Sequence, residues 1–339
     1  MELVALKAAF EEMARFAPLQ CVLVSRSGDL IGEYYAYESV KSTAINIHSV
    51  SKSILSLLVG IALRERWLTD IHQPIADWLP EYFDASIDGR KKSITLRHLL
   101  TMSAGLGWIE NPASIRRLWQ SSDWIAQVIG LPLVAIPGRQ FAYNTGLTHL
   151  LSVILSRASG MSTRMLAESY LFGPLGIELA DWKTDSQGYH IGGTDVYITP
   201  RNMLTLGQYL SNANAKSYLL PGASGDRGSV SHAPMGSKAM VLDAWLHESM
   251  KAQIELRQPG FWHPAYRHYG YLWWLRKLQS YDAVVASGYA GQLIITIRKL
   301  GLVVVTTADD TIPFTEVMKQ SNQIEGMVED LIIPAVREE

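Results

Sequence analysis

The sequence contains a single cysteine, Cys21, in 339 residues. A disulfide within the chain is therefore impossible, and a zinc site built from cysteines is excluded as well. Basic charge is not in excess either, because 30 Lys and Arg residues face 32 Asp and Glu residues and leave a formal net charge of -2. Proteins that bind nucleic acid normally show a basic excess or stripe, so we expect no nucleic-acid partner.

Long apolar runs are also missing. The longest one near a helix, residues 54–63, is interrupted by Ser56, whereas a membrane span needs roughly 18 or more apolar residues in a row. The N-terminal residues lack the basic start and apolar core of a secretion signal. We therefore expect a cytoplasmic protein with no membrane partner. No feature of the sequence indicates its oligomeric state.

Several motifs of other enzyme classes are missing too. The nine histidines include no His-Glu-x-x-His pair, and there is no Walker or dinucleotide-binding glycine pattern, so neither a metal nor another cofactor is expected. There is no Gly-x-Ser-x-Gly elbow, which disfavours an α/β-hydrolase. What the chain does have is 48% hydrophobic and only 18% charged residues, a composition that suits a large buried core.

The order of the predicted elements indicates an α+β fold. Residues 21–25 and 30–37 have the pattern of a hairpin of strands, and residues 271–307 contain four further short strands. Helical patterns dominate between them. Strands at both ends predict an antiparallel β-sheet flanked by helices, formed by residues 1–69 and 221–339, with an all-helical domain inserted at 70–220. A long irregular loop is expected at 213–240.

The most informative pair of residues is Ser49 and Lys52. They form a Ser-x-x-Lys motif at the head of a predicted apolar helix, where a spacing of three places both side chains on one face. A serine hydroxyl is a weak nucleophile without a base, and a lysine with a lowered pKa can act as that base. The alternative is a serine that caps the helix and a lysine exposed to solvent.

Two further segments could contribute to the same chemistry. Tyr143 follows a Pro-Gly turn and precedes a predicted helix, where it could relay protons if cationic neighbours favour its phenolate. Residues 286–292 contain small residues between two late strands, where a substrate could lie against the backbone and an N–H group could complete an oxyanion hole. A packed tyrosine and an ordinary glycine turn are the alternatives.

These three elements, in this order, resemble the serine β-lactamases and penicillin-binding proteins, most closely the class C-like branch. That branch includes family VIII carboxylesterases, D-aminopeptidases and 6-aminohexanoate-dimer hydrolases. The Ser-x-x-Lys motif is typical of this superfamily. Residues 94–106, 192–203 and 269–274 resemble further motifs of the branch, so the resemblance covers nearly the whole chain. It implies an antiparallel sheet with a helical lobe and an active site between the two.

The resemblance also implies roles for individual residues. Ser49 matches the acylated nucleophile, Lys52 the lysine that helps to deprotonate it, and Tyr143 the tyrosine that shares proton transfer and activates the deacylating water. The backbone N–H groups of Ser49 and Tyr289 match the oxyanion hole. Substrate contacts are expected from further residues at the predicted site: Trp108, Thr145, Ser287 and Gly288.

Two departures from the family pattern bear on the substrate. Thr145 stands where the Tyr-x-Asn motif has its asparagine, and Ala286 stands where the third motif has Lys or His. In β-lactamases these groups orient the amide and bind the carboxylate of the lactam. We therefore expect a serine hydrolase that cleaves a small ester or amide, with esterase activity favoured. The alternatives are a β-lactamase or D-aminopeptidase-type hydrolase, and a non-catalytic binding or sensor protein.

Overall fold

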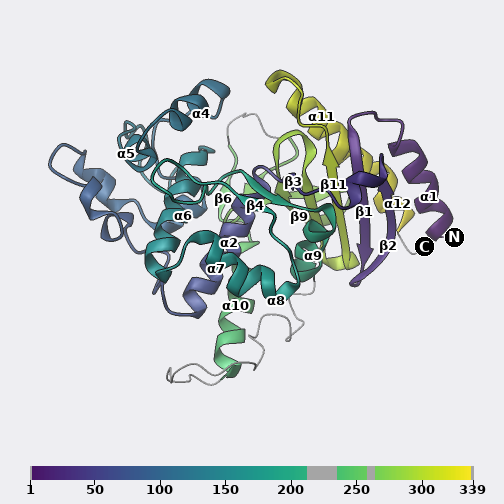
Figure 1. The fold of residues 1–339 in the computed structure, drawn as a ribbon, viewed down its shortest axis with the longest axis horizontal. Helices are drawn as coiled ribbons and strands as arrows, with labels where there is room; N and C mark the ends of the chain where they lie inside the picture. Colours follow the sequence, from purple (N-terminus) through teal and green to yellow (C-terminus); the bar gives the residue numbers. More distant parts are fainter. Residues whose placement is uncertain (1, 212–234, 258–263, 337–339) are drawn as a thin grey trace.

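The computed structural model describes residues 2–211, 235–257 and 264–336. Its main feature is an antiparallel sheet of eight strands in the order β2-β1-β11-β10-β9-β8-β7-β6 (Figure 1). The strands are β1 (Leu19–Arg26), β2 (Asp29–Tyr35), β6 (Ile254–Glu255), β7 (His268–Tyr269), β8 (Trp274–Leu278), β9 (Tyr281–Ser287), β10 (Leu293–Ile297) and β11 (Leu302–Ala308). Because β1 pairs with β11, strands from the two ends of the chain lie side by side in one sheet.

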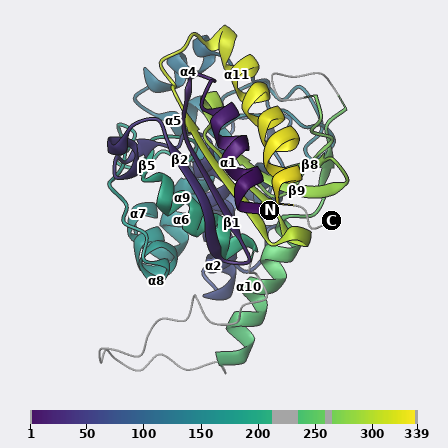
Figure 2. The ribbon, with the colours of Figure 1, turned by 90° about the vertical axis from the view of Figure 1, so that its right-hand side faces the viewer.

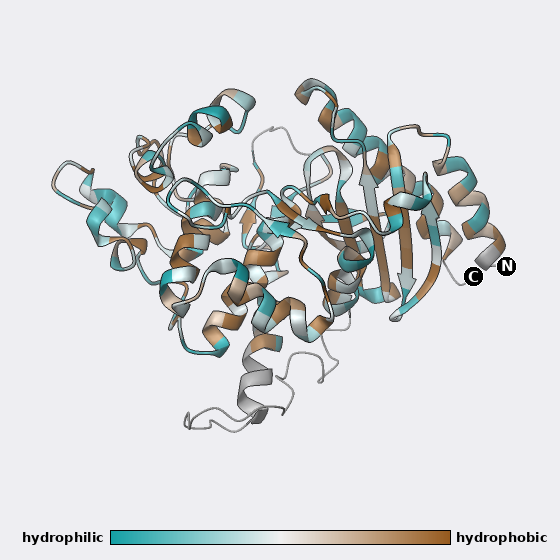
Figure 3. Ribbon diagram, in the orientation of Figure 1, coloured by the Kyte–Doolittle hydropathy of each residue, from teal (hydrophilic) through white to brown (hydrophobic). Residues whose placement is uncertain are grey.

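The central strands are covered by helices on both faces. Every residue of β10 and β11 is buried, and these strands are largely apolar (Figure 3), as expected for strands that face no solvent. Helices α1 (Glu2–Met13) and α11 (Phe314–Met327) lie on one face, with α2 (Val50–Arg64) and α9 (Pro200–Ser211) behind the strands in Figure 2.

A helical region occupies the middle of the chain and packs beside α2. Its helices are α3 (Leu96–Leu100), α4 (Pro112–Trp119), α5 (Trp124–Ile129), α6 (Thr145–Ser159), α7 (Thr163–Ala167) and α8 (Gly173–Leu175). Helix α2 contacts both α6 and α10 (Met235–Ser249). All residues of α2 except Leu63 are buried, so this helix is the shared core between the sheet and the helical region.

Short elements complete the fold. A second, three-stranded sheet joins β3 (Ile45–Asn46), β5 (Val196–Ile198) and β4 (Asp181–Trp182), and the chain ends in α12 (Ile333–Ala335). Turns of 3-10 helix lie at Glu38–Lys41, Ile75–Asp77, Pro80–Tyr82, Gly89–Ser93, Tyr289–Gly291 and Arg298–Leu300, and π-helical turns at Glu168–Phe172 and Val328–Ile332.

The predicted α+β class is confirmed, with an antiparallel sheet formed by both chain ends. The predicted boundary between residues 220 and 221 lies outside the described residues. Helix α9, however, was assigned to the helical domain and packs instead on β10 and β11. A Cβ atom added to Gly207 of α9 would lie 2.4 Å from Val303 Cγ1, so the helix contacts the sheet at very short range. Helix α9 (Pro200–Ser211) therefore lies with the sheet part of the molecule.

Two local predictions also need correction. The strand expected from residue 271 begins at Trp274, because Leu272 has a positive φ of 66° that extended backbone does not allow. The loop expected at 213–240 lies mostly outside the described residues, and from Met235 onward the chain is helical in α10. None of the helices in the described part of the chain combines the length and the apolarity that crossing a bilayer requires.

Candidate active site

Ser49 lies at the start of α2 and is held beside Lys52. As the residue that precedes the first turn of the helix, Ser49 could cap it, but its side chain makes no capping hydrogen bond. Its Oγ instead lies 2.9 Å from the Nζ of Lys52. The Lys52 side chain is only 1% exposed and also donates to the carbonyl oxygen of Gly193 at 2.7 Å. The alternative of a capping serine and a solvated lysine is therefore wrong.

Burial gives Lys52 the properties of a base. Desolvation disfavours the charged ammonium and lowers the pKa of Lys52 to about 8, although the negative charge of Glu110 acts in the opposite direction. An amine with this pKa is partly neutral near neutral pH, so it can accept the proton of a neighbouring hydroxyl.

The glycine that contacts Lys52 leaves little room for a side chain. A Cβ atom on Gly193 would lie 2.6 Å from Thr145 Cγ2 and 3.0 Å from Lys52 Nζ. The absence of a side chain therefore lets the Gly193 carbonyl reach the buried amine. Sequence reasoning included the Gly-Gly pair only as a family motif and assigned it no contact.

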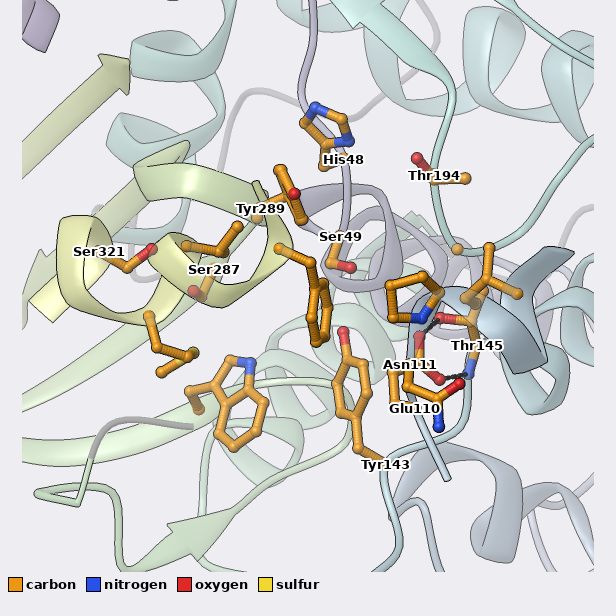
Figure 4. Close-up of a pocket in the computed structure, with 18 of the residues that line it drawn as sticks. His48, Ser49, Glu110, Asn111, Tyr143, Thr145, Thr194, Ser287, Tyr289 and Ser321 are labelled. Carbon is orange, nitrogen blue, oxygen red and sulfur yellow. Dashed lines mark hydrogen bonds between the residues drawn. The ribbon is translucent and has the colours of Figure 1, made fainter. Parts of the chain in front are cut away.

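Tyr143 lies close to both Ser49 and Lys52. Its ring is buried, stacks on Trp274 with a centroid separation of 5.5 Å, and has the Lys52 Nζ 5.0 Å from its centroid. Its hydroxyl points toward Ser49 (Figure 4). Burial raises the pKa of Tyr143 and the nearby charge of Glu110 raises it further, while a hydrogen bond with the Ser49 side chain lowers it. Burial therefore favours the protonated phenol in the resting site.

Ser287, Gly288 and Tyr289 lie at the end of β9, and all three line the pocket that contains Ser49. A Cβ atom on Gly288 would lie 2.4 Å from the carbonyl oxygen of Ile47, so this strand end packs directly on the segment that leads to Ser49. Among the described residues, neither the Ser49 nor the Tyr289 backbone N–H donates to a turn or loop carbonyl. Both groups remain candidates for the oxyanion hole.

The pocket lies between the helical region and the sheet region and has a volume of about 380 Å³. Residues from one face of helix α4 and from one face of helix α11 line the pocket. These two helices lie across from each other in Figure 1. The spacing of these residues is helical, with positions three, four or seven apart. They are Pro112, Ile115 and Trp119 from α4 and Phe314, Val317, Met318, Ser321 and Glu325 from α11.

Glu110 is a pocket residue that sequence reasoning missed. Its carboxylate accepts hydrogen bonds from the Thr145 backbone N–H at 3.0 Å and from the Thr145 hydroxyl, which Figure 4 shows as dashed lines. The indole N–H of Trp108 donates to the same carboxylate at 2.5 Å. Glu110 lies in an irregular segment 35 residues before Thr145, so no local sequence pattern predicts this contact.

Of the residues predicted to contact the substrate, Thr145 lines the described pocket and Trp108 does not. The indole of Trp108 instead donates to Glu110, which does line the pocket. Thr145 does line the pocket, and it begins α6 two residues after Tyr143. Thr145 thus links the tyrosine segment to the Glu110 carboxylate.

His48, the residue before Ser49, has a second contact at the pocket rim. It adopts a positive φ of 48°, which is uncommon for a residue with a side chain. The side chain of Asn46 accepts its backbone N–H at 2.9 Å, and its Nε2 lies 2.7 Å from Asp310 Oδ2. Its ring is 5.3 Å from that of Tyr289. In the described part of the chain, no three His, Cys, Asp or Glu side chains are grouped to hold a metal ion.

An antiparallel sheet joined to a helical region, with a Ser-x-x-Lys pair at the head of the buried helix and a tyrosine beside it, defines the class of β-lactamase-like and penicillin-binding-protein-like folds. The chain belongs to the beta-lactamase family, since its residues 21–324 match the model of that family.

Two curated relatives are hydrolases. Esterase EstB from Burkholderia gladioli is 28% identical over 150 residues, which are 40% of this chain and 38% of that esterase. The 6-aminohexanoate-dimer hydrolase from Paenarthrobacter ureafaciens is 23% identical over 199 residues, which are 56% of this chain and 50% of that enzyme. The chain thus aligns with half or less of the length of these relatives.

Solved structures share the fold over nearly the whole chain. EstCE1, described as a hydrolase with promiscuous acyltransferase activity, has a TM-score of 0.72 at 18% identity and covers 97% of this chain and 98% of its own. The octameric penicillin-binding protein homologue from Pyrococcus abyssi has a TM-score of 0.65 at 15% identity and covers 98% of this chain and 79% of its own. At these identities the similarity concerns the fold.

Proposed function

We propose that this chain is a serine hydrolase that cleaves a small ester or amide through an acyl-enzyme on Ser49. The observation that carries the proposal is the contact of the Ser49 hydroxyl with a lysine that is almost fully buried. A buried amine beside a hydroxyl at the wall of a pocket is otherwise unfavourable, since burial disfavours its charged form. The same burial is favourable for catalysis, because a neutral amine can act as the base that activates the serine nucleophile.

In the first step Ser49 Oγ attacks the carbonyl carbon of the substrate while Lys52 Nζ takes the hydroxyl proton. The negative oxygen of the tetrahedral intermediate would be stabilised by the backbone N–H groups of Ser49 and Tyr289. The carbon–oxygen or carbon–nitrogen bond to the leaving group then breaks. Tyr143 gives its proton to the leaving group and regains one from the Lys52 ammonium, so that the proton of Ser49 ends on the product.

In the second step water attacks the acyl-enzyme. Its proton passes through the same two groups, and Ser49 Oγ is released with a proton. This assignment makes Lys52 the base and Tyr143 the relay, because burial holds the phenol of Tyr143 in its protonated form. The predicted role of Tyr143 in activating the deacylating water then requires that Tyr143 first passes its own proton to Lys52, whose Nζ lies 5.0 Å from the centre of its ring.

The pocket favours esters whose acyl group has apolar surface and no negative charge. Trp119, Phe314, Val317 and Met318 form its walls on the two helices, and Ala286 supplies no cation for a carboxylate-bearing substrate. The names of the esterase and the dimer hydrolase support an ester or amide substrate. The same two names give less support to a β-lactam substrate than to an ester or amide.

The test is the hydrolysis of a short p-nitrophenyl ester by the wild type and by Ser49→Ala. We expect loss of activity in the variant with an unchanged melting temperature, and labelling of the wild type by a fluorophosphonate that the variant does not show. Full activity of the variant would overturn the assignment. Absence of both hydrolysis and labelling in the wild type would favour the non-catalytic binding protein, and rapid turnover of nitrocefin would favour the β-lactamase.

A further inference from the structure

Glu110 is a carboxylate in the pocket wall, and its charge acts on the buried Lys52 although the two side chains form no ion pair. The groups that donate hydrogen bonds to it are neutral, namely the Trp108 indole and the backbone N–H and hydroxyl of Thr145. Among the described residues, no Lys, Arg or His forms an ion pair with it. Three donors hold its two oxygens in one place, so the negative charge has a fixed position beside the nucleophile.

The other carboxylate of the wall is compensated. Glu325 lies 2.5 Å from the Nη1 of Arg276 and accepts a hydrogen bond from the Tyr266 hydroxyl at 3.0 Å. Of the residues that line the described pocket, His48 is the one basic side chain, and it is bonded to Asp310. In the form of the enzyme that reacts, Lys52 is neutral because it acts as the base, so the uncompensated charge that a substrate meets in the pocket is the negative charge of Glu110.

The remaining surface of the pocket is rich in aromatic rings. Tyr143, Trp274, Trp119, Tyr289 and Phe314 all contribute to its lining. The faces of such rings attract cations, and quaternary ammonium groups are bound in proteins by aromatic side chains of this kind. An unpaired carboxylate and a set of aromatic rings around one cavity favour the same class of ligand, which is an organic cation.

We propose that Glu110 is a specificity-determining residue, and that it selects acyl donors that carry a positively charged ammonium group and rejects those that carry an anion. This inference rests on the proposed function, because it concerns the substrate of the same Ser49 site. The physical reason is the Coulomb energy between the fixed carboxylate and the charge of the acyl group, which is strong where protein excludes water. Glu110 itself takes no part in bond making.

The test uses three p-nitrophenyl esters whose acyl groups differ in charge. The 4-(trimethylammonio)butyrate ester is cationic, the 5,5-dimethylhexanoate ester has a carbon in place of the nitrogen and is neutral, and the 4-sulfobutyrate ester is anionic. For the wild type we expect kcat/KM of the cationic ester to exceed that of the anionic ester by on the order of 100-fold. The permanent charges make this ratio independent of substrate titration.

Glu110→Gln is the informative variant because it keeps the contacts of the side chain. Its amide oxygen can accept the Trp108 indole and the Thr145 N–H, and its amide nitrogen can donate to the Thr145 hydroxyl. We expect the ratio of cationic to anionic ester to fall at least about tenfold. The esters are compared at a pH above about 8, where Lys52 is mostly neutral, and effects of the variant on the chemical steps then act on all three esters alike and cancel in the ratio.

Glu316→Gln is the matched control. Glu316 is an exposed residue of the first turn of α11 and is not among the pocket residues, so its replacement removes the same charge from outside the pocket. We expect the control to keep the wild-type ratio. The inference is overturned if Glu110→Gln retains that ratio too, or if the wild type hydrolyses the anionic ester as well as the cationic one.

A binding measurement separates this inference from the proposed function. Calorimetry with the Ser49→Ala variant compares butyltrimethylammonium with 1-butanesulfonate, with and without Glu110→Gln. A preference for the cation that disappears in the double variant supports the role of Glu110 even if no ester is hydrolysed, which would overturn only the proposed function. Equal affinity for the two ions overturns the role of Glu110, and ester hydrolysis that depends on Ser49 would still stand.

Discussion

The Nε2 of His48 lies 2.7 Å from the Oδ2 of Asp310. This contact joins the residue before the proposed nucleophile to the segment between β11 and α11, and α11 forms one wall of the pocket. The hydroxyl of Tyr289 donates to the carbonyl of Ile312 in the same segment at 3.2 Å. The side chains of His48 and Tyr289 therefore both bind the segment that leads into α11. These two residues lie on the two sides of the proposed oxyanion hole.

The first prediction concerns the pH dependence of this contact. The hydrogen bond and charge of His48 lower the pKa of Asp310. A carboxyl group with a lowered folded-state pKa stabilises the fold above its unfolded pKa of about 3.9, and this contribution is lost as the pH falls through the folded pKa. Since both groups are partly exposed, Asp310→Asn should reduce the free energy of unfolding at pH 6 by about 0.2–1 kcal/mol.

Chemical denaturation between pH 2 and pH 7 provides the measurement for Asp310. The stability difference between the wild type and Asp310→Asn should be present at pH 5–6 and shrink toward zero below about pH 3. Asp330→Asn, an exposed position of the C-terminal region, is the control and should show no such dependence. A difference that stays constant over the whole range would contradict an ion pair at this position.

The second prediction concerns the energetic consequence of burying Lys52. Its folded-state pKa is about 8, below the value of about 10.4 of a free lysine. Between these values the unfolded chain binds more protons than the folded one, so the stability of the wild type rises with pH. Lys52→Met should be inactive toward p-nitrophenyl esters and more stable than the wild type at pH 7 by about 1–3 kcal/mol.

The pH series for Lys52→Met decides whether this gain comes from the charge. The stability advantage of the variant should shrink as the pH approaches 10, because the wild-type lysine loses its proton in both states. In the wild type, kcat/KM should rise with pH through about pH 8, where Lys52 becomes neutral. A stability gap that does not change with pH would show that packing, rather than desolvated charge, distinguishes the two proteins.

Sequence reasoning predicted the parts of the site that are close along the chain. Ser49 and Lys52 are one helical turn apart, and their contact follows from helix geometry. Tyr143 and the segment at Ser287 were located through the family motifs they resemble. Their presence in one pocket depends on the antiparallel sheet and the helical insertion, which the order of strands and helices indicated correctly.

The residues that sequence reasoning missed act through tertiary contacts. Glu110 meets Thr145 across 35 residues, and Gly193 meets Lys52 across 141 residues. The pattern of either segment alone gives no sign of its partner. The position of α9 was predicted incorrectly for a similar reason, because an amphipathic helix shows which face is buried and not which element covers it.

The third prediction tests the spacing at the proposed oxyanion hole. Gly288→Ala would place a Cβ atom 2.4 Å from the Ile47 carbonyl oxygen, so the end of β9 must move away from the start of α2. Separation of the Ser49 and Tyr289 N–H groups should lower kcat by about 10–100-fold with a smaller effect on KM. Gly89→Ala is the control, since an added Cβ there meets nothing within 4 Å.

The kinetic pattern for Gly288→Ala is what distinguishes an oxyanion hole from a wall of the binding site. Loss of transition-state stabilisation appears in kcat, whereas loss of a substrate contact appears in KM. Circular dichroism and the melting temperature should confirm that the variant is folded. An unchanged kcat in the folded variant would remove the end of β9 from the proposed mechanism.

The fourth prediction separates two roles of Tyr143, proton donation and packing. Its ring is stacked on Trp274, and Tyr143→Phe keeps that ring while it removes the hydroxyl. An ethyl ester needs a proton for its leaving group, so its kcat/KM should fall by about 100–1,000-fold. A p-nitrophenyl ester with the same acyl group has a leaving group that departs as a stable anion, and its loss should be about tenfold or less. Tyr34→Phe, on β2 away from the pocket residues, should leave both rates unchanged. Equal losses for the two esters would mean that Tyr143 positions Ser49 and donates no proton, and the relay through Lys52 would then have to end on a different group.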